Sequence, residues 1–191
     1  MTLLEGHAGR LPAREANAMH LDMPVEQLVR RRDTRFQLGF ASEACQRVPG
    51  DGNFALASSR RGLHVLARNE EGLAPPVDAL RVAYGDRLEV GPPRARLIEG
   101  VQVREPIMQV RICTQVRFLQ AVRRALAARG ALPSEVFVRS RYGVLRYEAP
   151  LADLLGLPAE LGRLTLGSAR HWIVLDRYAA VTHDPGGGKA A

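Results

Sequence analysis

Hydrophobic and polar residues alternate in the middle of the chain, along a segment that starts at Pro106 and runs to about Cys113. Met108, Val110 and Ile112 fall on one side of an extended chain, and the residues between them fall on the other. A period of two is typical of a strand with one buried face. A proline can open such a strand because its missing N–H is not needed at the first position. The pattern therefore predicts a half-buried strand here.

A helical pattern follows directly, over residues 115–129 (QVRFLQAVRRALAAR). Thr114 is expected to cap its start, Gly130 to end it and Pro133 to prevent its continuation. Its opposite face is basic, and this stretch contains no acidic residue. Its apolar positions share one face of a 3.6-residue wheel: Phe118, Leu119, Val122 and Leu126.

The remaining elements complete a unit with the order βαββαβ. Two short alternating strands, over residues 135–140 and 143–149, flank a turn that contains glycine. Leucines at helical spacing over residues 151–165 predict a helix that is kinked or split by a glycine and a proline, and a last strand is expected over 167–181. This order is that of a ferredoxin-like sandwich, with helices on one face of an antiparallel sheet. The expected core includes Leu119, Val122, Leu126, Leu154 and Val174.

The first half has a less regular pattern. Strands are expected over residues 16–23, 34–44, 52–59 and 86–90, and helices over residues 24–32, 60–71 and 75–85. These elements suggest a second, degraded βαββαβ unit. The predicted fold class is therefore α+β, with two ferredoxin-like βαββαβ sandwiches in tandem, the first of them irregular. The predicted divisions are an α+β domain over 1–100, a ferredoxin-like domain over 101–181 and a flexible tail over 182–191.

The basic residues are unevenly distributed along the 191 residues. Residues 1–100 hold 14 Arg against 13 acidic residues, whereas residues 101–191 hold 12 Arg and one Lys against 7 acidic residues. The near absence of lysine is attributed mainly to codon bias, so position is more informative than residue type. The excess of positive charge makes the second half the expected binder of a polyanion.

The sequence lacks the residues that several kinds of nucleotide-binding, metal and catalytic site need. The sole lysine, Lys189, is followed by Ala190 where a P-loop has serine or threonine, so no guanine nucleotide is expected to bind. The histidines show no spacing typical of a metal site. Asp153, Glu160 and Asp176 do not form a recognisable acid–base pair. We therefore expect no catalytic residues, no metal and no cofactor.

Other patterns bear on the compartment. No apolar run approaches the roughly 20 residues that span a bilayer, and the first residues lack the apolar core of a secretory signal. Cys45 and Cys113 could form a lone disulfide, but two reduced thiols in a cytoplasmic protein are favoured. We expect a cytoplasmic protein without a membrane partner.

Arginines of the second half are candidates for contact with RNA phosphates, because the planar guanidinium matches phosphate geometry. The candidates are Arg117, Arg123, Arg124, Arg139, Arg141, Arg163 and Arg170. A basic face that is merely solvated remains the alternative. RNA recognition motifs share the βαββαβ order, but their third strand carries several aromatic residues, and here it offers only Tyr142 and Tyr147. Sequence-specific reading of RNA is therefore weakly supported, and no DNA specificity is expected.

Four motifs of the second half form a recognisable set. They are Glu105-Pro106 at a strand start, Pro150-Leu151 at a helix entry, the loop Leu164-Thr165-Leu166-Gly167, and Tyr178 at the end of an aromatic-rich strand. This set resembles the C-terminal region of translational GTPases of the elongation factor G class. The segments RRGLHVLARNEE (60–71) and LEVGPPRARLIEG (88–100) are similar to domain III of that family.

The two similar regions abut, without the long domain IV of elongation factor G, which is closest to the domain order of TypA/BipA. Ala169 departs from the family, which has a glycine at that position. The resemblance implies a non-enzymatic, ribosome- or RNA-associated module of domains III and V that lacks its own GTPase domain. Ribosomal RNA and a separate GTPase subunit are the partners that it implies. A small regulatory or oligomerising protein that binds a ligand or partner, and an evolutionary remnant, remain the alternatives.

Overall fold

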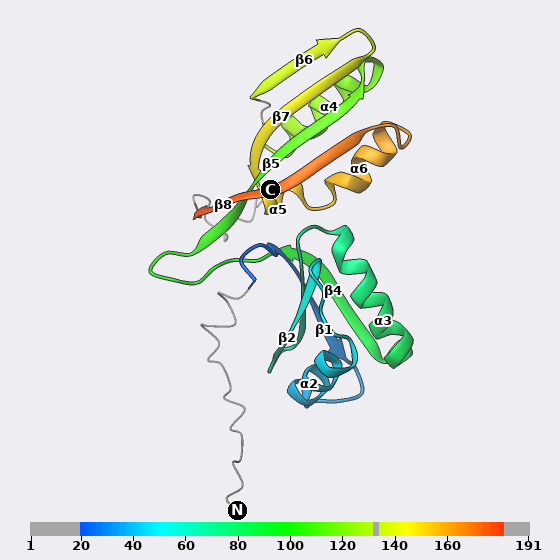
Figure 1. Cartoon of the computed structure of the whole chain (residues 1–191), viewed down its shortest axis with the longest axis vertical. Helices are drawn as coiled ribbons and strands as arrows, with labels where there is room; N and C mark the ends of the chain where they lie inside the picture. Colours follow the sequence, from blue (N-terminus) through cyan, green and yellow to red (C-terminus); the bar gives the residue numbers. More distant parts are fainter. Residues whose placement is uncertain (1–19, 132–133, 182–191) are drawn as a thin grey trace, which may run out of the picture.

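The computed structural model describes residues 20–131 and 134–181, which form two sandwiches in succession (Figure 1). Each sandwich has a four-stranded antiparallel sheet and the element order βαββαβ. The predicted fold class, two tandem ferredoxin-like α+β units, is confirmed. The first unit is complete rather than irregular, since its strands follow the same spatial order as those of the second.

The first sandwich has the sheet order β2-β3-β1-β4. Its elements are β1 (Val25–Arg31), α2 (Gln37–Arg47), β2 (Phe54–Ser59), β3 (Gly62–Ala67), the 3₁₀ turn η1 (Glu71–Leu73), α3 (Ala74–Tyr84), the 3₁₀ turn η2 (Gly85–Arg87) and β4 (Leu88–Ala95). The second sandwich has the order β6-β7-β5-β8. Its elements are β5 (Arg104–Gln115), α4 (Val116–Ala128), β6 (Glu135–Arg139), β7 (Tyr142–Pro150), α5 (Leu151–Leu154), α6 (Leu157–Leu164) and β8 (Arg170–Ala180).

Several predictions for the first half were wrong. Residues 24–32 form strand β1 instead of a helix, 34–44 contribute to helix α2 instead of a strand, and 60–71 contain strand β3 instead of a helix. Of the strand expected over 16–23, residues 20–22 form a turn, and residues 16–19 lie outside the described residues. The strands at 52–59 and 86–90 and the helix at 75–85 correspond to β2, β4 and α3.

The second half follows its predicted elements closely. The predicted split of the 151–165 helix occurs between α5 and α6, where Gly156 adopts φ +77°, a conformation that suits glycine. Strand β5 begins at Arg104, two residues before Pro106. Thr114 does not cap α4, because it is fully buried within β5. Pro133 and the tail at 182–191 lie outside the described residues.

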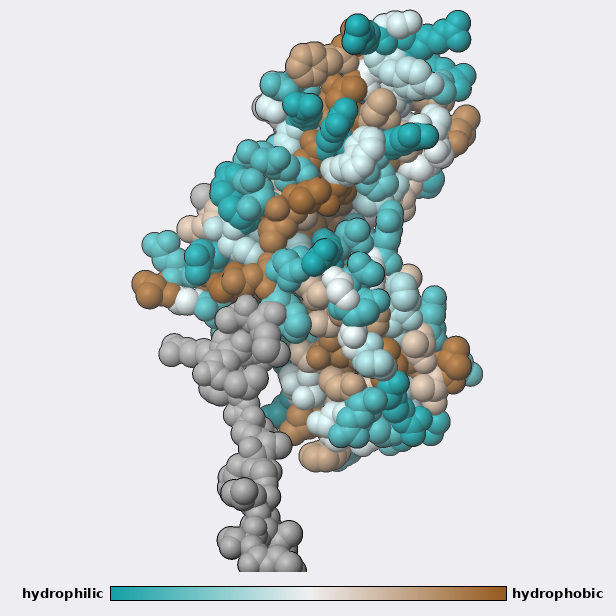
Figure 2. Space-filling view, viewed as in Figure 1, coloured by the Kyte–Doolittle hydropathy of each residue, from teal (hydrophilic) through white to brown (hydrophobic). Residues whose placement is uncertain are grey.

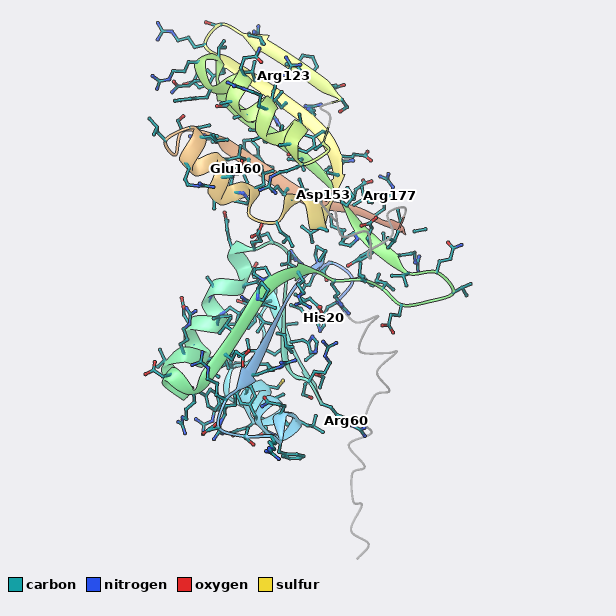
Figure 3. The ribbon with its side chains drawn as sticks, turned by 180° about the vertical axis from the view of Figure 1, so that it is seen from behind. His20, Arg60, Arg123, Asp153, Glu160 and Arg177 are labelled. Atoms are coloured by element: carbon teal, nitrogen blue, oxygen red, sulfur yellow. The ribbon has the colours of Figure 1, made fainter. Side chains whose placement is uncertain are left out.

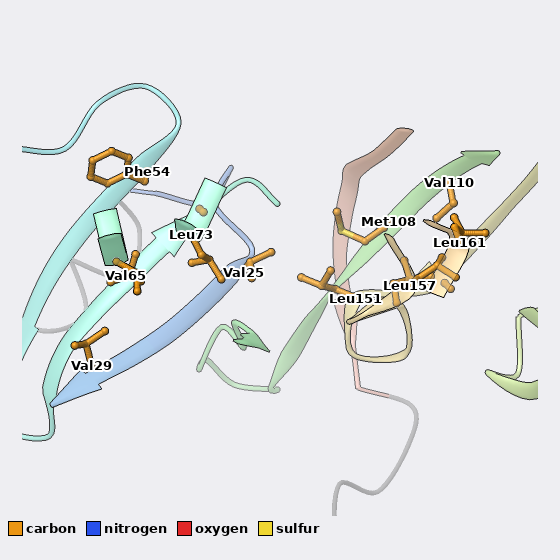
Figure 4. Packing of buried hydrophobic residues seen from close by; sticks show 14 of the residues in the cluster. Val25, Val29, Phe54, Val65, Leu73, Met108, Val110, Leu151, Leu157 and Leu161 are labelled. Carbon is orange, nitrogen blue, oxygen red and sulfur yellow. The ribbon is translucent and has the colours of Figure 1, made fainter. Parts of the chain in front are cut away.

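One cluster of buried hydrophobic residues runs through both sandwiches, and Val25 of the first faces Leu151 of the second (Figure 4). Of the five predicted core residues, Leu119, Val122, Leu126 and Leu154 are buried. Val174 is 61% exposed, so that prediction was wrong. Its register partner Gln109 lies on the outward side of β5, and directly paired residues share a face of the sheet. The second sheet is therefore covered by helices on one side only, and its other face is open.

Candidate nucleic-acid interface

Five of the seven predicted arginines lie at one end of the second sandwich. At this end β5 and β6 finish and β7 and β8 begin, because Gln115 pairs with Tyr142, Arg139 pairs with Tyr142, and Cys113 pairs with Arg170. Helix α4 starts there, directly after β5, and α6 finishes there, shortly before β8. We call this region the basic end, and it comprises Arg117, Arg139, Arg141, Arg163 and Arg170.

The start of α4 is held close to the turn between β6 and β7. The Val116 N–H donates a hydrogen bond of 3.0 Å to the Arg141 carbonyl oxygen. Gly143 permits the close approach, because a Cβ there would lie 2.8 Å from a methyl carbon of Leu119. A groove of about 440 Å³ results, with Arg117 and Arg141 in its lining. The groove therefore brings together two arginines that are far apart in sequence.

The backbone adds to the positive potential in this groove. Within the described residues no side chain caps the first turn of α4, and this turn contains no acidic residue. The N–H groups of an uncapped first turn, together with the helix dipole, favour an anion at this position. A phosphate group in the groove would therefore meet both guanidinium groups and helix N–H donors.

The basic end is not neutralised by carboxylates. The segments 106–134, 136–147 and 161–175 contain no Asp or Glu. All seven predicted arginines are exposed, and within the described residues none of them forms an ion pair. The Arg117 guanidinium carbon lies 4.6 Å from the ring centre of Phe118. These guanidinium groups are therefore available to an external anion.

The other two candidates, Arg123 and Arg124, lie further along the exposed side of α4. Figure 3 labels Arg123 on this helix. Seven residues of helix separate Arg117 from Arg124, a rise of about 10 Å. They extend the positive surface from the basic end along the helix instead of joining the groove.

Arg129, at the end of α4, has a structural role. Its guanidinium donates to the Glu160 carboxylate at 2.8 and 3.0 Å and to the backbone carbonyls of Asp153 and Leu155 at 2.7 and 3.0 Å. These bonds connect α4 with the split between α5 and α6, and all its partners belong to the protein. Arg129 is therefore a different case from the exposed arginines on the same helix.

Sequence reasoning missed Arg111 and Trp172. These residues pair directly across β5 and β8, and the Arg111 guanidinium carbon lies 5.3 Å from the centre of the Trp172 ring. Both lie on the open face of the sheet, and Trp172 is 48% exposed. The alternating pattern of β5 already placed Arg111 on its outward side. Only the pairing register between β5 and β8 shows that Trp172 lies beside it.

His64 and His171 lie near carboxylates of the protein itself, and the two cysteines are not joined by a disulfide. His64 Nε2 lies 3.0 Å from Ser59 Oγ, and its Nδ1 lies 3.5 Å from the Glu26 carboxylate. His171 Nε2 lies 3.8 Å from the Glu71 carboxylate. Cys45 and Cys113 are free thiols, and burial raises the pKa of Cys45.

Residues 20–131 and 134–181 contain no group of three His, Cys, Asp or Glu side chains that could hold a metal ion. No helix in these two ranges combines the length and apolar character needed to cross a membrane.

Comparison with known proteins bears on the second half. The family model described as "Elongation factor G C-terminus" matches residues 102–186. A crystal structure of a protein from Thermus thermophilus superposes with a TM-score of 0.58 at 14% sequence identity, over 91% of this chain and 43% of that one. At this identity the likeness establishes the fold alone, and the chain spans less than half the length of that protein. Residues 102–186 thus match the C-terminal region of elongation factor G, the family that the four motifs of the second half resemble.

Proposed function

We propose that the protein is a non-enzymatic, translation-factor-like module that binds ribosomal RNA through the basic end. The observation that carries this proposal is the gathering of five exposed arginines at one end of the second sandwich, where α4 starts without a side-chain cap, in segments without carboxylates. Arginine pairs well with phosphate oxygens, and phosphate contacts supply most of the affinity for RNA that is independent of sequence. The family match to residues 102–186 supports ribosomal RNA as the source of these phosphates.

Two finer statements belong to the same proposal. The domain order of the TypA/BipA branch would explain why two sandwiches abut here. A chain that docks on the ribosome without catalysis would modulate the binding of other factors or act together with a separate GTPase subunit.

Ribosome co-sedimentation over a series of salt concentrations tests the proposal. Phosphate binding releases counterions, so log affinity should fall with log salt by about 0.7–0.9 per phosphate neutralised. The triple variant R117Q/R139Q/R141Q should weaken co-sedimentation and reduce this slope by about two to three. The fold should survive, because exposed substitutions usually change stability by less than about 0.5 kcal/mol.

The first sandwich offers a matched control. Arg60, Arg61 and Arg94 are exposed and form no ion pair within the described residues. R60Q/R61Q/R94Q removes the same charge and should keep most of the binding and of the slope. R123Q/R124Q should have an intermediate effect, because these residues extend the positive surface along α4 without lining the groove. Equal losses in both triple variants would contradict a role specific to the basic end.

A second candidate function rests on a cavity between the two sandwiches. It measures about 280 Å³ and is lined by Val25, Glu71, Leu151 and His171, among others. This volume approaches the lower limit of small-molecule sites. A regulatory protein that binds a small ligand would use this cavity. Wild-type protein that fails to co-sediment with ribosomes even at low salt would favour this candidate.

A further inference from the structure

The open face of the second sheet carries three exposed aromatic side chains. Phe137 lies on β6, Tyr142 on β7 and Trp172 on β8, and they are 55%, 53% and 48% exposed. The register places all three on the side away from the helices, because Phe137 pairs with Val144, Tyr142 with Gln115 and Trp172 with Arg111. We call these three residues the aromatic platform.

The platform spans the full width of the sheet. Neighbouring strands lie about 4.8 Å apart, so β6 and β8 are separated by about 14 Å. Between Trp172 of β8 and Glu135 at the start of β6 lies a hollow of about 520 Å³, lined by Gln109, Arg111 and Arg146 among others. Figure 2 views this face, with hydrophobic side chains along its middle and hydrophilic ones around them. The surface is therefore broad enough for two or three flat rings, the number that related sheet surfaces stack.

The positions of the aromatic residues explain why an RNA-recognition surface was weakly supported from sequence. Of the two tyrosines of β7, only Tyr142 is exposed, and Tyr147 is buried on the helix-facing side. The other two rings, Phe137 and Trp172, come from the outer strands of the sheet. This placement differs from that of RNA recognition motifs, so it favours stacking that tolerates any base over sequence-specific reading.

On the open face, arginines far from the basic end form ion pairs, whereas the described arginines nearer to it do not. Far from this end the charged side chains are paired. Arg177 contacts the Glu148 carboxylate at 3.0 Å and also contacts Asp176. The hydrogen bond to Asp176 and, to a smaller extent, the one to Glu148 raise the pKa of Arg177. Arg146 contacts Glu135 at 3.5 Å. Nearer the basic end, Arg111, Arg139 and Arg170 make no such ion pair within the described residues. Phosphates would therefore be held at the part of the face nearest the basic end, beside the platform.

We propose that this open face binds an unpaired segment of RNA, whose bases stack on Trp172, Phe137 and Tyr142 while Arg111, Arg139 and Arg170 contact its phosphates. Stacking requires unpaired bases, because the faces of bases in a duplex are covered by their neighbours. Glu148 and Gln109 line the hollow and supply acceptors for a 2′-hydroxyl group, the feature that distinguishes RNA from DNA. The inference rests on the proposed function and deepens it, since it names the form of RNA. Its stacking residues lie on the open face of the sheet, and it shares Arg139 and Arg170 with the basic end.

The chain provides its own probe, because Trp172 is its only tryptophan. The experiment titrates the full chain with an unstructured 12-nucleotide RNA, with a duplex RNA of the same length and with the single-stranded DNA of the same sequence. The single-stranded RNA should quench Trp172 fluorescence, the duplex should not, and the DNA should bind more weakly.

Variants then separate stacking from charge. In an anisotropy assay with labelled single-stranded RNA, Phe137→Ala and Trp172→Leu should each weaken binding by roughly 5- to 150-fold, the loss expected for one stacked base. Trp172→Phe keeps an aromatic ring and should restore most of the affinity. Val82→Ala, at a side chain of α3 that is 89% exposed, is the control and should bind like the wild type. Circular dichroism verifies that each variant is folded.

The outcomes distinguish this inference from the proposed function. Unquenched Trp172 and full affinity in Phe137→Ala would overturn the stacking surface, even if R117Q/R139Q/R141Q reduces ribosome binding. Quenching by single-stranded RNA would support the stacking surface, even if ribosomes do not co-sediment. Equal binding of RNA and DNA, or equal quenching by the duplex, would also overturn the inference as stated.

Discussion

The two sandwiches share one topology but have different surfaces. In the first, arginines and acidic residues are nearly equal in number, 14 against 13 over residues 1–100, and the ion pairs include Arg31–Asp33, Arg47–Glu43, Arg68–Asp22 and Arg81–Asp78 at 2.6 to 3.2 Å. In the second, the seven predicted arginines are all exposed and form no ion pair within the described residues. The same fold thus supports a neutral surface and a cationic one, which agrees with the general rule that function is carried by sites and not by folds.

The largest effect is expected from matched core truncations in the third strand of each sandwich. Leu63 of β3 and Leu145 of β7 are both fully buried. Each substitution by alanine should cost about 2–5 kcal/mol in the free energy of unfolding, because a cavity remains. Urea unfolding would be followed by circular dichroism, which reports on both sandwiches, and by Trp172 fluorescence, which reports on the second. Leu145→Ala should shift the fluorescence midpoint, whereas Leu63→Ala should shift only part of the dichroism signal.

Leu166→Ala, at a side chain that is 82% exposed, serves as the control and should change neither transition. Equal shifts of both probes in both truncations would show one cooperative unit and would contradict the division into two domains near residue 100.

Much of the second sandwich could be predicted because its elements obey simple periods. In β5 the buried and outward residues alternate strictly from Met108 onward, and α4 has one apolar stripe. The first sandwich does not offer such patterns. In β3 five of the six residues are buried, on both faces of the sheet, since Leu66 packs with Met23 and Ala55 on the side opposite Leu63 and Val65. Burial on both faces removes the alternation that marks a strand.

Two other errors have similar causes. In β1 the apolar residues Val25, Leu28 and Val29 have a spacing that also fits a helix, and a bulge interrupts the pairing with β4 between Gln27 and Val29. Before and within α2, Phe36, Leu38 and Phe40 alternate with other residues as in a strand. These conflicts between local pattern and tertiary packing cannot be resolved from one sequence.

The sequence could likewise predict only part of the candidate site. The sequence made the arginines candidates for phosphate contact, because positive charge is in excess in the second half and the 115–129 helix has no acidic residue. It could not show that Arg117, Arg141 and Arg170 lie at one end of the sheet, since that depends on the register of three strands. It also missed the platform, whose residues come from three strands that are separate in sequence.

The two sandwiches differ in the helical segment between their third and fourth strands. The first sandwich has one continuous helix there, α3, whereas the second has α5 and α6 separated at Gly156. Arg129 holds this split through four hydrogen bonds, so Arg129→Met should cost about 1–3 kcal/mol and lower the midpoint of the Trp172 transition. Arg124→Met, at an exposed residue of the same helix, is the control and should change stability by less than about 0.5 kcal/mol. A neutral Arg129→Met would show that the split does not depend on this side chain.

Alkaline pH should destabilise the second sandwich through Tyr147. Burial raises the pKa of Tyr147 well above its usual value, and within the described residues its hydroxyl group has no hydrogen-bond partner. The folded pKa exceeds the unfolded pKa of about 10, so this contribution to stability is fully present below pH 10. As pH rises above 10, the unfolded tyrosine ionises first and stability falls, by up to about 1.4 kcal/mol per pH unit.

Thermal unfolding of the wild type and of Tyr147→Phe between about pH 8 and 11.5 measures this effect, because the window spans the unfolded pKa. The variant should lose less stability at high pH. At neutral pH it should match the wild type or exceed it by about 1 kcal/mol, because the unpaired hydroxyl group is removed. Parallel pH profiles for the two proteins would assign the alkaline loss to other groups.

The smallest effect concerns the contact between the sandwiches. The Gly156 N–H, at the start of α6, donates to the Glu70 carboxylate oxygens at 2.9 and 3.1 Å. This carboxylate satisfies a donor that a helix start leaves without a partner, and its negative charge interacts favourably with the helix dipole. Glu70→Ala should therefore destabilise the second sandwich by about 0.5–1 kcal/mol and lower the Trp172 unfolding midpoint, although Glu70 belongs to the first sandwich. Glu71→Ala removes only the longer, exposed contact with His171, at 3.8 Å, and should have almost no effect. If Glu70→Ala left the Trp172 transition unchanged, the second sandwich would gain no stability from the first through this contact.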